Sequence, residues 1–265
     1  MSTLKFSSTI IALFLSGFIF SQEFAVDVKK ESEEVNDNSY NAQWAGMDFG
    51  FISTNRSDEW ENKMFSSIIF NLNFVEYKLP IYKQYLGLTT GLGMGFREYR
   101  FQTDYSLVKN GDISTMEMGN PHLYDTMANV SRSSLNLGYF HLPILLDFAT
   151  KQRGTRSFYV ACGVVGGIRY YGNHSQRGEY SNGDKFNNVI RNKGAFNTNL
   201  LTLEATARIG YGQFGLFANY SLNGLFKNGA APTINPFNVG ISLNFDYNDD
   251  EPIDGEDVDL DSIEF

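Results

Sequence analysis

Residues 157–171, SFYVACGVVGGIRYY, alternate strictly between two kinds of side chain. Successive side chains of an extended chain point to opposite faces, so one face would be apolar and the other small or polar. The first face holds Phe158, Val160, Cys162, Val164, Ile168 and Tyr170, and the second holds Tyr159, Ala161, Gly163, Val165, Gly167 and Arg169. This asymmetry predicts a strand of a β-barrel in lipid, with bulky groups toward the acyl chains and glycines and a charge toward the interior.

Seven further stretches alternate in the same way. They are 44–53, 65–77, 85–97, 135–148, 199–211, 214–220 and 237–247. The connections 54–64, 98–132, 172–198 and 221–236 are long, and the connections 78–84, 149–156 and 212–213 are short. Eight strands of about ten residues are typical of a small membrane barrel. We therefore predict an all-β chain that forms an eight-stranded antiparallel up-and-down transmembrane β-barrel over residues 44–247, with a filled interior.

The stretch 135–148 changes parity. Leu135 and Leu137 fall on one face, whereas the large apolar residues from position 140 onward fall on the other. A β-bulge near Gly138 would bring both sets to the outside, because one extra residue reverses the alternation. The second register turns His141 and Asp147 inward.

Residues 1–21 have the layout of a secretory signal peptide. Lys5 is followed by an apolar run over 10–20 that is too short for a spanning helix, and residues 22–43 form a polar lead-in. A mean hydropathy of -0.26 excludes a helical membrane bundle but fits a barrel, in which only alternate residues need be apolar. The single cysteine, Cys162, excludes an internal disulfide framework.

Residues 248–265 form an acidic tail. Their nine acidic side chains, with no basic residue among them, account for the whole formal net charge of -9. The acidity is therefore local, and it argues against a nucleic-acid partner. The segment from Asp257 begins like a calcium loop but supplies neither the glycine nor the glutamate that an EF-hand needs. We expect a disordered tail, with loose divalent-cation binding or docking onto a basic periplasmic partner as alternatives.

Several polar side chains fall on the inner face of the predicted barrel. They are Asp48, Arg97, Arg169, Glu204, Arg208 and His141. We interpret them as a structural polar network, because buried charges are usually paired. Glu204 and Arg208 lie about 13 Å apart along one strand, so each is expected to pair across the barrel. Arg169, near the outer mouth, is expected to pair with Glu204 or with an acidic loop residue. The functional alternative is a narrow polar or proton-linked pathway.

No catalytic, cofactor or metal residues are assigned. His141 with Glu204 and either Ser133 or Ser242 would resemble a hydrolase triad, but no spacing supports that arrangement. The alternating glycines at 91–95 are not a nucleotide fingerprint, because no helical pattern follows them. They fit better as space for larger side chains that reach across the interior.

Five blocks carry a family resemblance. They are VEYKLPIYKQYLGLTTGLG (75–93), YFHLPILLDF (139–148), YVACGVVGGIRYY (159–171), ARIGYGQFGLFANYSLNGLF (207–226) and NPFNVGISLNF (235–245). Together they resemble the outer-membrane β-barrel family of Bacteroidetes that is often labelled PorT-like. The resemblance covers about 44–247 and implies an outer-membrane barrel, but it implies little about activity. The acidic tail departs from the usual barrel end, which commonly stops at a terminal aromatic residue.

The expected protein is an integral outer-membrane barrel with both termini in the periplasm. By elimination, its role is structural or involves binding through the long loops 98–132 and 172–198, rather than that of a general porin or an enzyme. Its expected partners are outer-membrane lipid, the barrel-assembly machinery during biogenesis and a periplasmic partner of the tail. The alternatives are a lipid-modifying outer-membrane enzyme and an accessory component of a secretion or motility machinery.

Overall fold

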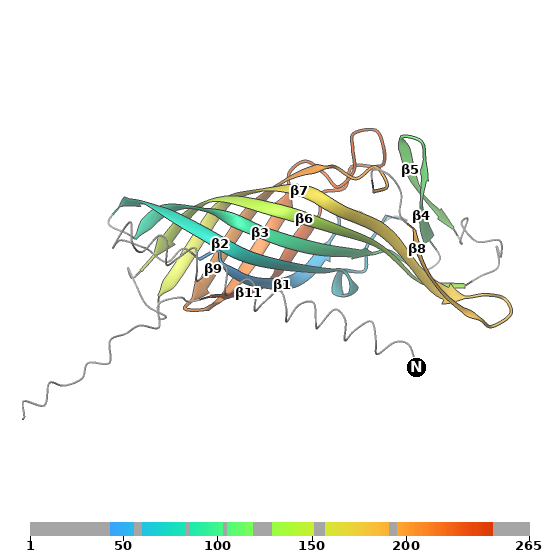
Figure 1. Cartoon of the computed structure of the whole chain (residues 1–265), viewed down its shortest axis with the longest axis horizontal. Helices are drawn as coiled ribbons and strands as arrows, with labels where there is room; N and C mark the ends of the chain where they lie inside the picture. The colour runs from blue at the N-terminus through green and yellow to red at the C-terminus, as the bar shows by residue number, and fades with distance from the viewer. Residues whose placement is uncertain are drawn as a thin grey trace, which may run out of the picture.

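The computed structural model describes residues 43–55, 60–82, 85–102, 105–118, 129–150, 157–190 and 195–245 (Figure 1). The predicted signal peptide at 1–21, the lead-in apart from Gln43, and the acidic tail at 248–265 lie outside these residues. The described part is all-β, with one short 3-10 turn, η1, at Met64–Ser66. Within it, no helix is long and apolar enough to cross a membrane.

Eight strands form one closed antiparallel ring. They are β1 (Gly46–Ser53), β2 (Ile68–Tyr82), β3 (Leu86–Arg100), β6 (Asn129–Ala149), β7 (Phe158–Glu179), β9 (Leu201–Tyr211), β10 (Phe214–Ser221) and β11 (Phe237–Asn244). Each strand pairs with the next one in this series, and β11 pairs back with β1, so the ring closes. The prediction of eight antiparallel strands in up-and-down order is confirmed.

The two ends of the ring differ in their connections. The short-turn end carries the links from β2 to β3, from β6 to β7 and from β9 to β10, together with the start of β1 and the end of β11. The long-connection end carries the links from β1 to β2, from β3 to β6, from β7 to β9 and from β10 to β11. The predicted alternation between long and short connections is therefore present in the structure.

Three further strands lie within the long connections. β4 (Tyr105–Asn110) and β5 (Ile113–Met118) form a hairpin, and β8 (Lys185–Ile190) pairs with the end of β7. β6 and β7 have 21 and 22 residues and extend past the ring at the right of Figure 1. The prediction of strands of about ten residues is wrong for these two. The exposed positions of these extensions are polar, and most of their buried positions are polar as well, so the extensions lack the apolar alternation that would identify them in the sequence.

The predicted bulge near Gly138 has a different position from the one expected. β6 keeps a single register with β3 through this region, so its own backbone is not bulged. The extra residue is Tyr170 on β7, which lies between the residues paired with Tyr139 and Gly138. A bulge in the neighbouring strand does not change which way the side chains of β6 point.

Leu135 and Leu137 therefore do not reach the outside of the ring. Both point inward and are fully buried, whereas Phe140 and Leu142 point outward and are each 49% exposed. The parity change in the sequence marks a reversal of polarity along β6. Before Gly138 the outward face carries no large apolar residue, whereas from Phe140 onward it is apolar, and Tyr139 and Leu145 remain inside.

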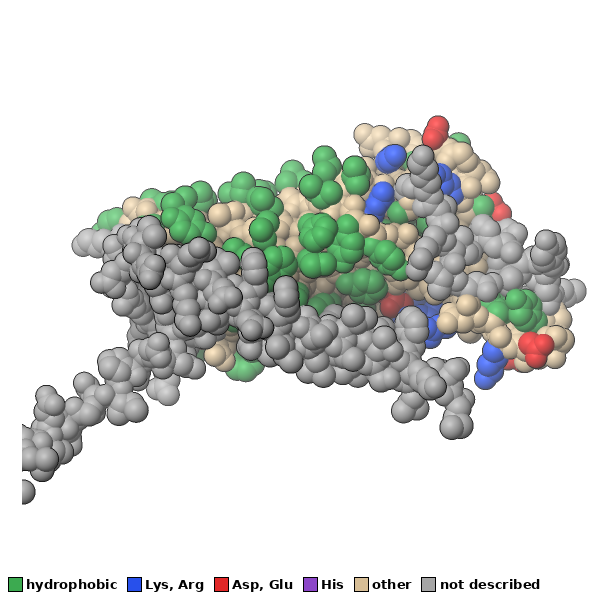
Figure 2. Space-filling model, viewed as in Figure 1, with side chains coloured by type: hydrophobic (Ala, Val, Ile, Leu, Met, Phe, Trp, Pro, Cys, Tyr) green, Lys and Arg blue, Asp and Glu red, His purple; other side chains and the backbone are tan. Residues whose placement is uncertain are grey.

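The outside of the ring is apolar over its middle and its short-turn end. On the face in view, Figure 2 shows a band of hydrophobic side chains, with Lys, Arg, Asp and Glu gathered toward the long-connection end. We call this band the apolar belt. Its members include Phe49, Leu79, Leu88, Leu92, Phe140, Leu142, Ile144, Leu146, Phe148, Phe158, Val160, Ile168, Leu201, Leu203, Ile209, Phe214, Leu216, Val239 and Ile241. On β7 the alternation predicted from the sequence is confirmed through Arg169.

Candidate functional site: the ion-paired interior and its apolar cap

The charges inside the ring come from strands that are not neighbours. Asp48 lies on β1, Arg97 on β3, and Glu204 and Arg208 lie four residues apart on β9; each is at most 3% exposed. Four residues of a strand span about 13 Å, so the two β9 charges act at different depths. The alternation of each strand turns these side chains inward, and the closure of the ring brings them within reach of one another.

Arg97 and Glu204 form a bidentate ion pair across the interior. The two terminal nitrogens of Arg97 donate to the two carboxylate oxygens of Glu204 at 2.6 and 2.7 Å. The guanidinium also lies over the ring of Tyr139, 4.8 Å from its centroid. Two parallel charge-assisted hydrogen bonds fix both side chains, so β3 and β9 are tied together across the ring.

Arg208 and Asp48 form a second buried pair that joins β9 to β1. The same Asp48 oxygen accepts hydrogen bonds from the side-chain amides of Asn71 and Asn73, both at 3.2 Å. The guanidinium of Arg208 lies 4.8 Å from the ring centroid of Trp44. The carboxylate is therefore compensated by one cation and two amide donors.

Lys78 and Asp147 form a third buried pair, with the ammonium 2.7 Å from the carboxylate. The predicted inner face omits Lys78, because Pro80 favours a turn over 78–84, whereas β2 continues to Tyr82. A bulge at Phe74 shifts the register of β2 and brings Lys78 inward. The sequence does carry one signal that Lys78 points inward. Leu79, the apolar residue after Lys78, is exposed and continues the alternation of the two faces past the bulge.

His141 lies inside the ring without a hydrogen-bond partner among the described residues. Its imidazole stacks on Tyr139, with ring centroids 6.2 Å apart and an interplanar angle of 16°. Both Glu204 oxygens are held by Arg97, and Ser133 is eight residues away on the same strand, or about 26 Å. Ser242 Oγ and both His141 nitrogens have no hydrogen-bond partner among the described residues, so the structure does not bring these groups together as a triad.

Arg169 takes a neutral partner instead of the expected acid. It donates to the backbone carbonyl oxygen of Thr198 at 2.8 Å and also contacts the hydroxyl of that residue. Glu204 is already engaged by Arg97, so the predicted pairing of Arg169 with Glu204 is wrong. Arg169 is half-buried, and it anchors the connection that leads into β9.

That connection makes a tight left-handed turn. Ala195, Phe196 and Asn197 have φ values of 46°, 57° and 59°, a region that non-glycine residues rarely adopt. The turn inserts Phe196 into the mouth of the ring, where it is fully buried, and the Thr198 hydroxyl donates to the carbonyl of Ala195 at 2.9 Å. The burial of the aromatic ring offsets the backbone strain.

Phe196 belongs to an apolar cluster at the long-connection end. Strands and connections both contribute to this cluster, which we call the apolar cap: Ile52, Trp60, Ile69, Tyr99, Phe101, Leu107, Leu135, Leu137, Tyr139, Ala195, Phe196, Phe217, Leu225, Phe226 and Ile234. Tyr139 is a member of the cap and also contacts the Arg97 guanidinium, so the cap lies directly beside the Arg97–Glu204 pair. The sequence pattern predicts polar side chains in the interior of the ring. It does not predict the apolar cap.

The β4–β5 hairpin is fastened to this end. The Ser114 amide donates to the carbonyl of Ala230 at 2.6 Å, and the Ser114 hydroxyl donates to the carbonyl of Phe196 at 2.8 Å. Asn197 donates to the Ser114 hydroxyl at 3.2 Å and to the carbonyl of Gly111 at 3.3 Å. The long connections therefore pack into one folded surface.

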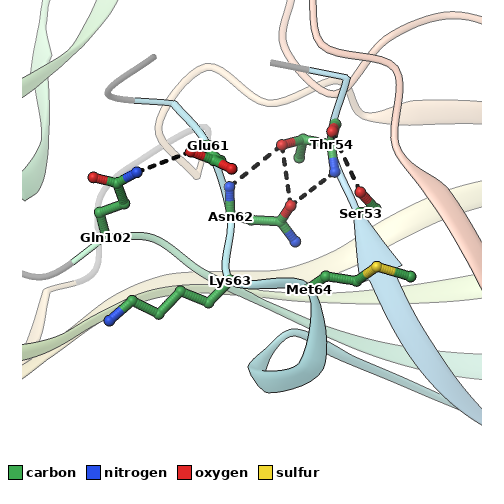
Figure 3. A pocket seen from close by; sticks show the side chains of 7 residues that line it. All are labelled: Ser53, Thr54, Glu61, Asn62, Lys63, Met64 and Gln102. Atoms are coloured by element: carbon green, nitrogen blue, oxygen red, sulfur yellow. Dashed lines mark hydrogen bonds between the residues drawn. The ribbon is translucent and has the colours of Figure 1, made fainter. Parts of the chain in front are cut away.

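An open depression of about 510 Å³ lies beside this surface (Figure 3). Apart from Lys63, its polar side chains are engaged with neighbouring residues: Asn62 accepts from the backbone amide of Thr54 at 2.7 Å, and Gln102 donates to Glu61 at 3.0 Å. Groups that are already paired have little capacity left for a ligand. Among the described residues, no three His, Cys, Asp or Glu side chains are grouped so that they could hold a metal ion.

The interior glycines provide space for side chains from other strands. A methyl group at Gly95 would collide with the His141 imidazole and lie 2.5 Å from Asn71 Oδ1. We expect Gly95→Val to lower the free energy of unfolding by about 1–3 kcal/mol, because a filled interior cannot absorb the extra volume. Gly166→Val on the outside of β7 is the matched control, since its nearest contact would be at 3.7 Å. Urea titration in detergent micelles measures both, and equal effects would contradict this explanation.

The comparison with known proteins identifies no related protein. No family model, no curated protein and no solved structure matches this chain.

Proposed function

We propose that this chain is an integral β-barrel of a bacterial outer membrane, with a structural or binding role exerted through its long connections. The apolar belt is the observation that carries the proposal. Five successive outward positions of β6 hold Phe140, Leu142, Ile144, Leu146 and Phe148, each between 44% and 49% exposed. Water-soluble monomers rarely expose contiguous apolar patches of this kind, whereas lipid requires them.

The polar interior supports the same placement. In a membrane barrel the charged side chains avoid lipid by pointing inward, where they pair. Three buried ion pairs and the apolar cap occupy the interior of the described ring. An eight-stranded barrel leaves no open channel once its interior is filled with side chains, so a general porin is the less suitable role.

The long-connection end is suited to binding. The β4–β5 hairpin, the turn around Phe196 and the segment near Ala230 are held together by hydrogen bonds and share the apolar cap. A preorganised surface loses less conformational entropy on binding than free loops would. Recognition of a ligand or partner at the cell surface is therefore the role that we favour over membrane integrity alone.

The direction of insertion follows from the connections. Outer-membrane barrels have short periplasmic turns and longer extracellular loops, so we place the short-turn end and both termini in the periplasm. The predicted signal peptide and the resemblance to PorT-like barrels of Bacteroidetes are consistent with this placement and form part of the proposal. On this basis the lipid of the outer membrane and the barrel-assembly machinery are the first partners.

The single cysteine gives a direct test. Cys162 lies on the outward face of β7, within the apolar belt. We expect a water-soluble maleimide to leave it unlabelled in lipid vesicles and to label it fully after denaturation, because acyl chains shield the thiol. Rapid labelling in intact vesicles would contradict the membrane placement.

Two cysteine variants then test the orientation. In a Cys162→Ala background, Asp112→Cys in the β4–β5 turn should react with an impermeant maleimide added to intact cells, whereas Gln213→Cys in the turn between β9 and β10 should not. Labelling of Gln213→Cys alone would reverse the proposed direction. Heat-modifiable mobility in detergent gels shows that each variant has folded.

A further inference from the structure

Three arginines lie on the outer face of three adjoining strands, on the long-connection side of the apolar belt. On β6, Arg132 is eight residues beyond Phe140, and its side chain reaches back to Glu98. Arg100 is on β3, Arg132 on β6 and Arg177 on β7. Arg132 is the cross-strand partner of Arg177, and Arg100 is paired with Ser134, two residues along from Arg132. The three side chains therefore form one basic patch on the outside of the ring.

Opposite charge covers this patch only in part. Glu98 on β3 accepts from both Arg100 and Arg132, and the side chains of these two arginines remain 29% and 30% exposed. Arg177 donates to the neutral Asn187 side chain at 3.2 Å, which does not compensate its charge. Glu98 contacts two of the three guanidiniums, and Glu179, two residues along β7 from Arg177, lies opposite Lys185. Among the described residues, the patch is therefore net positive.

The patch lies at a polarity boundary. Toward the short-turn end, the next outward residue after Glu98 on β3 is Phe96, about 7 Å away along the strand. Phe65 of η1 is 80% exposed, and η1 lies beside Arg100, since the Arg100 amide donates to the Ser67 hydroxyl at 2.9 Å. Exposed aromatics together with cations are typical of the interface between acyl chains and headgroups.

We propose, on the basis of the membrane placement above, that Arg100, Arg132 and Arg177 bind the phosphate of an anionic lipid in the leaflet at the long-connection end. The planar guanidinium presents paired N–H donors that match phosphate oxygens. The acyl chains of the same lipid lie on the apolar belt below the patch. Glu98 Oε1 accepts from both Arg100 and Arg132 and so brings their guanidiniums together, which forms the site before the lipid arrives.

The test uses the full chain and defined lipids. The wild-type protein is reconstituted with phosphatidylcholine and phosphatidic acid, extracted in mild detergent, and examined by native mass spectrometry for retained lipid. We expect preferential retention of phosphatidic acid, and a drop of roughly tenfold in this preference for the triple variant Arg100→Gln, Arg132→Gln, Arg177→Gln. Unchanged preference would overturn the proposal.

A control variant removes two positive charges elsewhere at this end of the molecule. Lys109→Gln and Lys227→Gln lie outside the basic patch and should leave the lipid preference intact. An equal loss in this variant would mean that general charge attraction, and not the patch, retains the lipid. Equally tight retention of inorganic phosphate by the wild-type protein would also overturn a lipid site.

Two further arms separate folding and placement from lipid recognition. If the triple variant lacks heat-modifiable mobility, the single variant Arg177→Gln is tested instead, because Glu98 is then still held by the other two arginines. Arg177→Gln should still lower the preference for phosphatidic acid. An unchanged preference would overturn the proposal. Wild-type protein that inserts into phosphatidylcholine vesicles without selecting phosphatidic acid contradicts only the basic-patch site. Failure to insert into any vesicle contradicts the proposed function itself.

Discussion

Glu204→Ala is expected to lower the free energy of unfolding by about 3–5 kcal/mol, because it leaves the guanidinium of Arg97 buried without a counter-charge. Both carboxylate oxygens of Glu204 are engaged by Arg97, and each side chain is only 3% exposed. Replacement water cannot easily reach a charge at this depth. The midpoint of urea unfolding in detergent micelles, followed by heat-modifiable mobility, measures the loss.

Two further variants separate the lost partner from lost packing. Arg97→Met combined with Glu204→Leu removes both charges and should recover most of the stability, because no uncompensated charge remains. Glu179→Ala at the exposed end of β7 should change the free energy of unfolding by less than about 0.5 kcal/mol. This account of the interior would be contradicted if the double variant Arg97→Met, Glu204→Leu were less stable than Glu204→Ala. It would also be contradicted if Glu204→Ala were as stable as Glu179→Ala.

Alternation alone predicts most of the ring. A strand between lipid and a polar interior has one environment on each face, so its sequence carries the period of two directly. This is why the amino-acid sequence suffices to place Asp48, Arg97, Glu204 and Arg208 on the inner face. The up-and-down order also follows, because the alternation of long and short connections has few other solutions.

The alternation does not show which side chains pair with one another inside the ring. Arg97 and Glu204 are 107 residues apart in sequence and meet only because the ring closes. Arg169 contacts Thr198 because a left-handed turn brings that residue to the mouth, and no local pattern predicts such a turn in Ala195–Asn197. Lys78 escapes the alternation because a bulge shifts the parity of β2.

The parity change in β6 has a different cause from the one that the sequence favours. A local bulge would explain it, but the strand runs through in one register and its surroundings change instead. Leu135 and Leu137 belong to the apolar cap, as in the core of a water-soluble protein. From Phe140 onward every second side chain is large and apolar and faces outward, as in a membrane protein. On the proposed membrane placement, a reversal of this kind in one unbroken strand would mark the level at which the chain leaves the lipid.

This reversal gives the second prediction of large effect. Leu142 lies on the outward face of β6 within the apolar belt and is 49% exposed. We expect Leu142→Arg to lower the free energy of unfolding in lipid vesicles by about 2–4 kcal/mol, because a guanidinium on the lipid face near the midplane loses its hydration. Urea titration of vesicle-inserted protein measures the effect.

Asn136→Arg is the matched control, because it places the same group on the same face of the same strand, six residues toward the long-connection end. Asn136 lies beyond the reversal, where the outward face is polar, so the cost there should be at most about 1 kcal/mol. A water-soluble ring would give the opposite pattern, because an arginine at position 142 would then improve solubility without a cost in stability. Equal stability of the two variants in vesicles would therefore refute the membrane placement, whereas a large difference would locate the lipid boundary between the two positions.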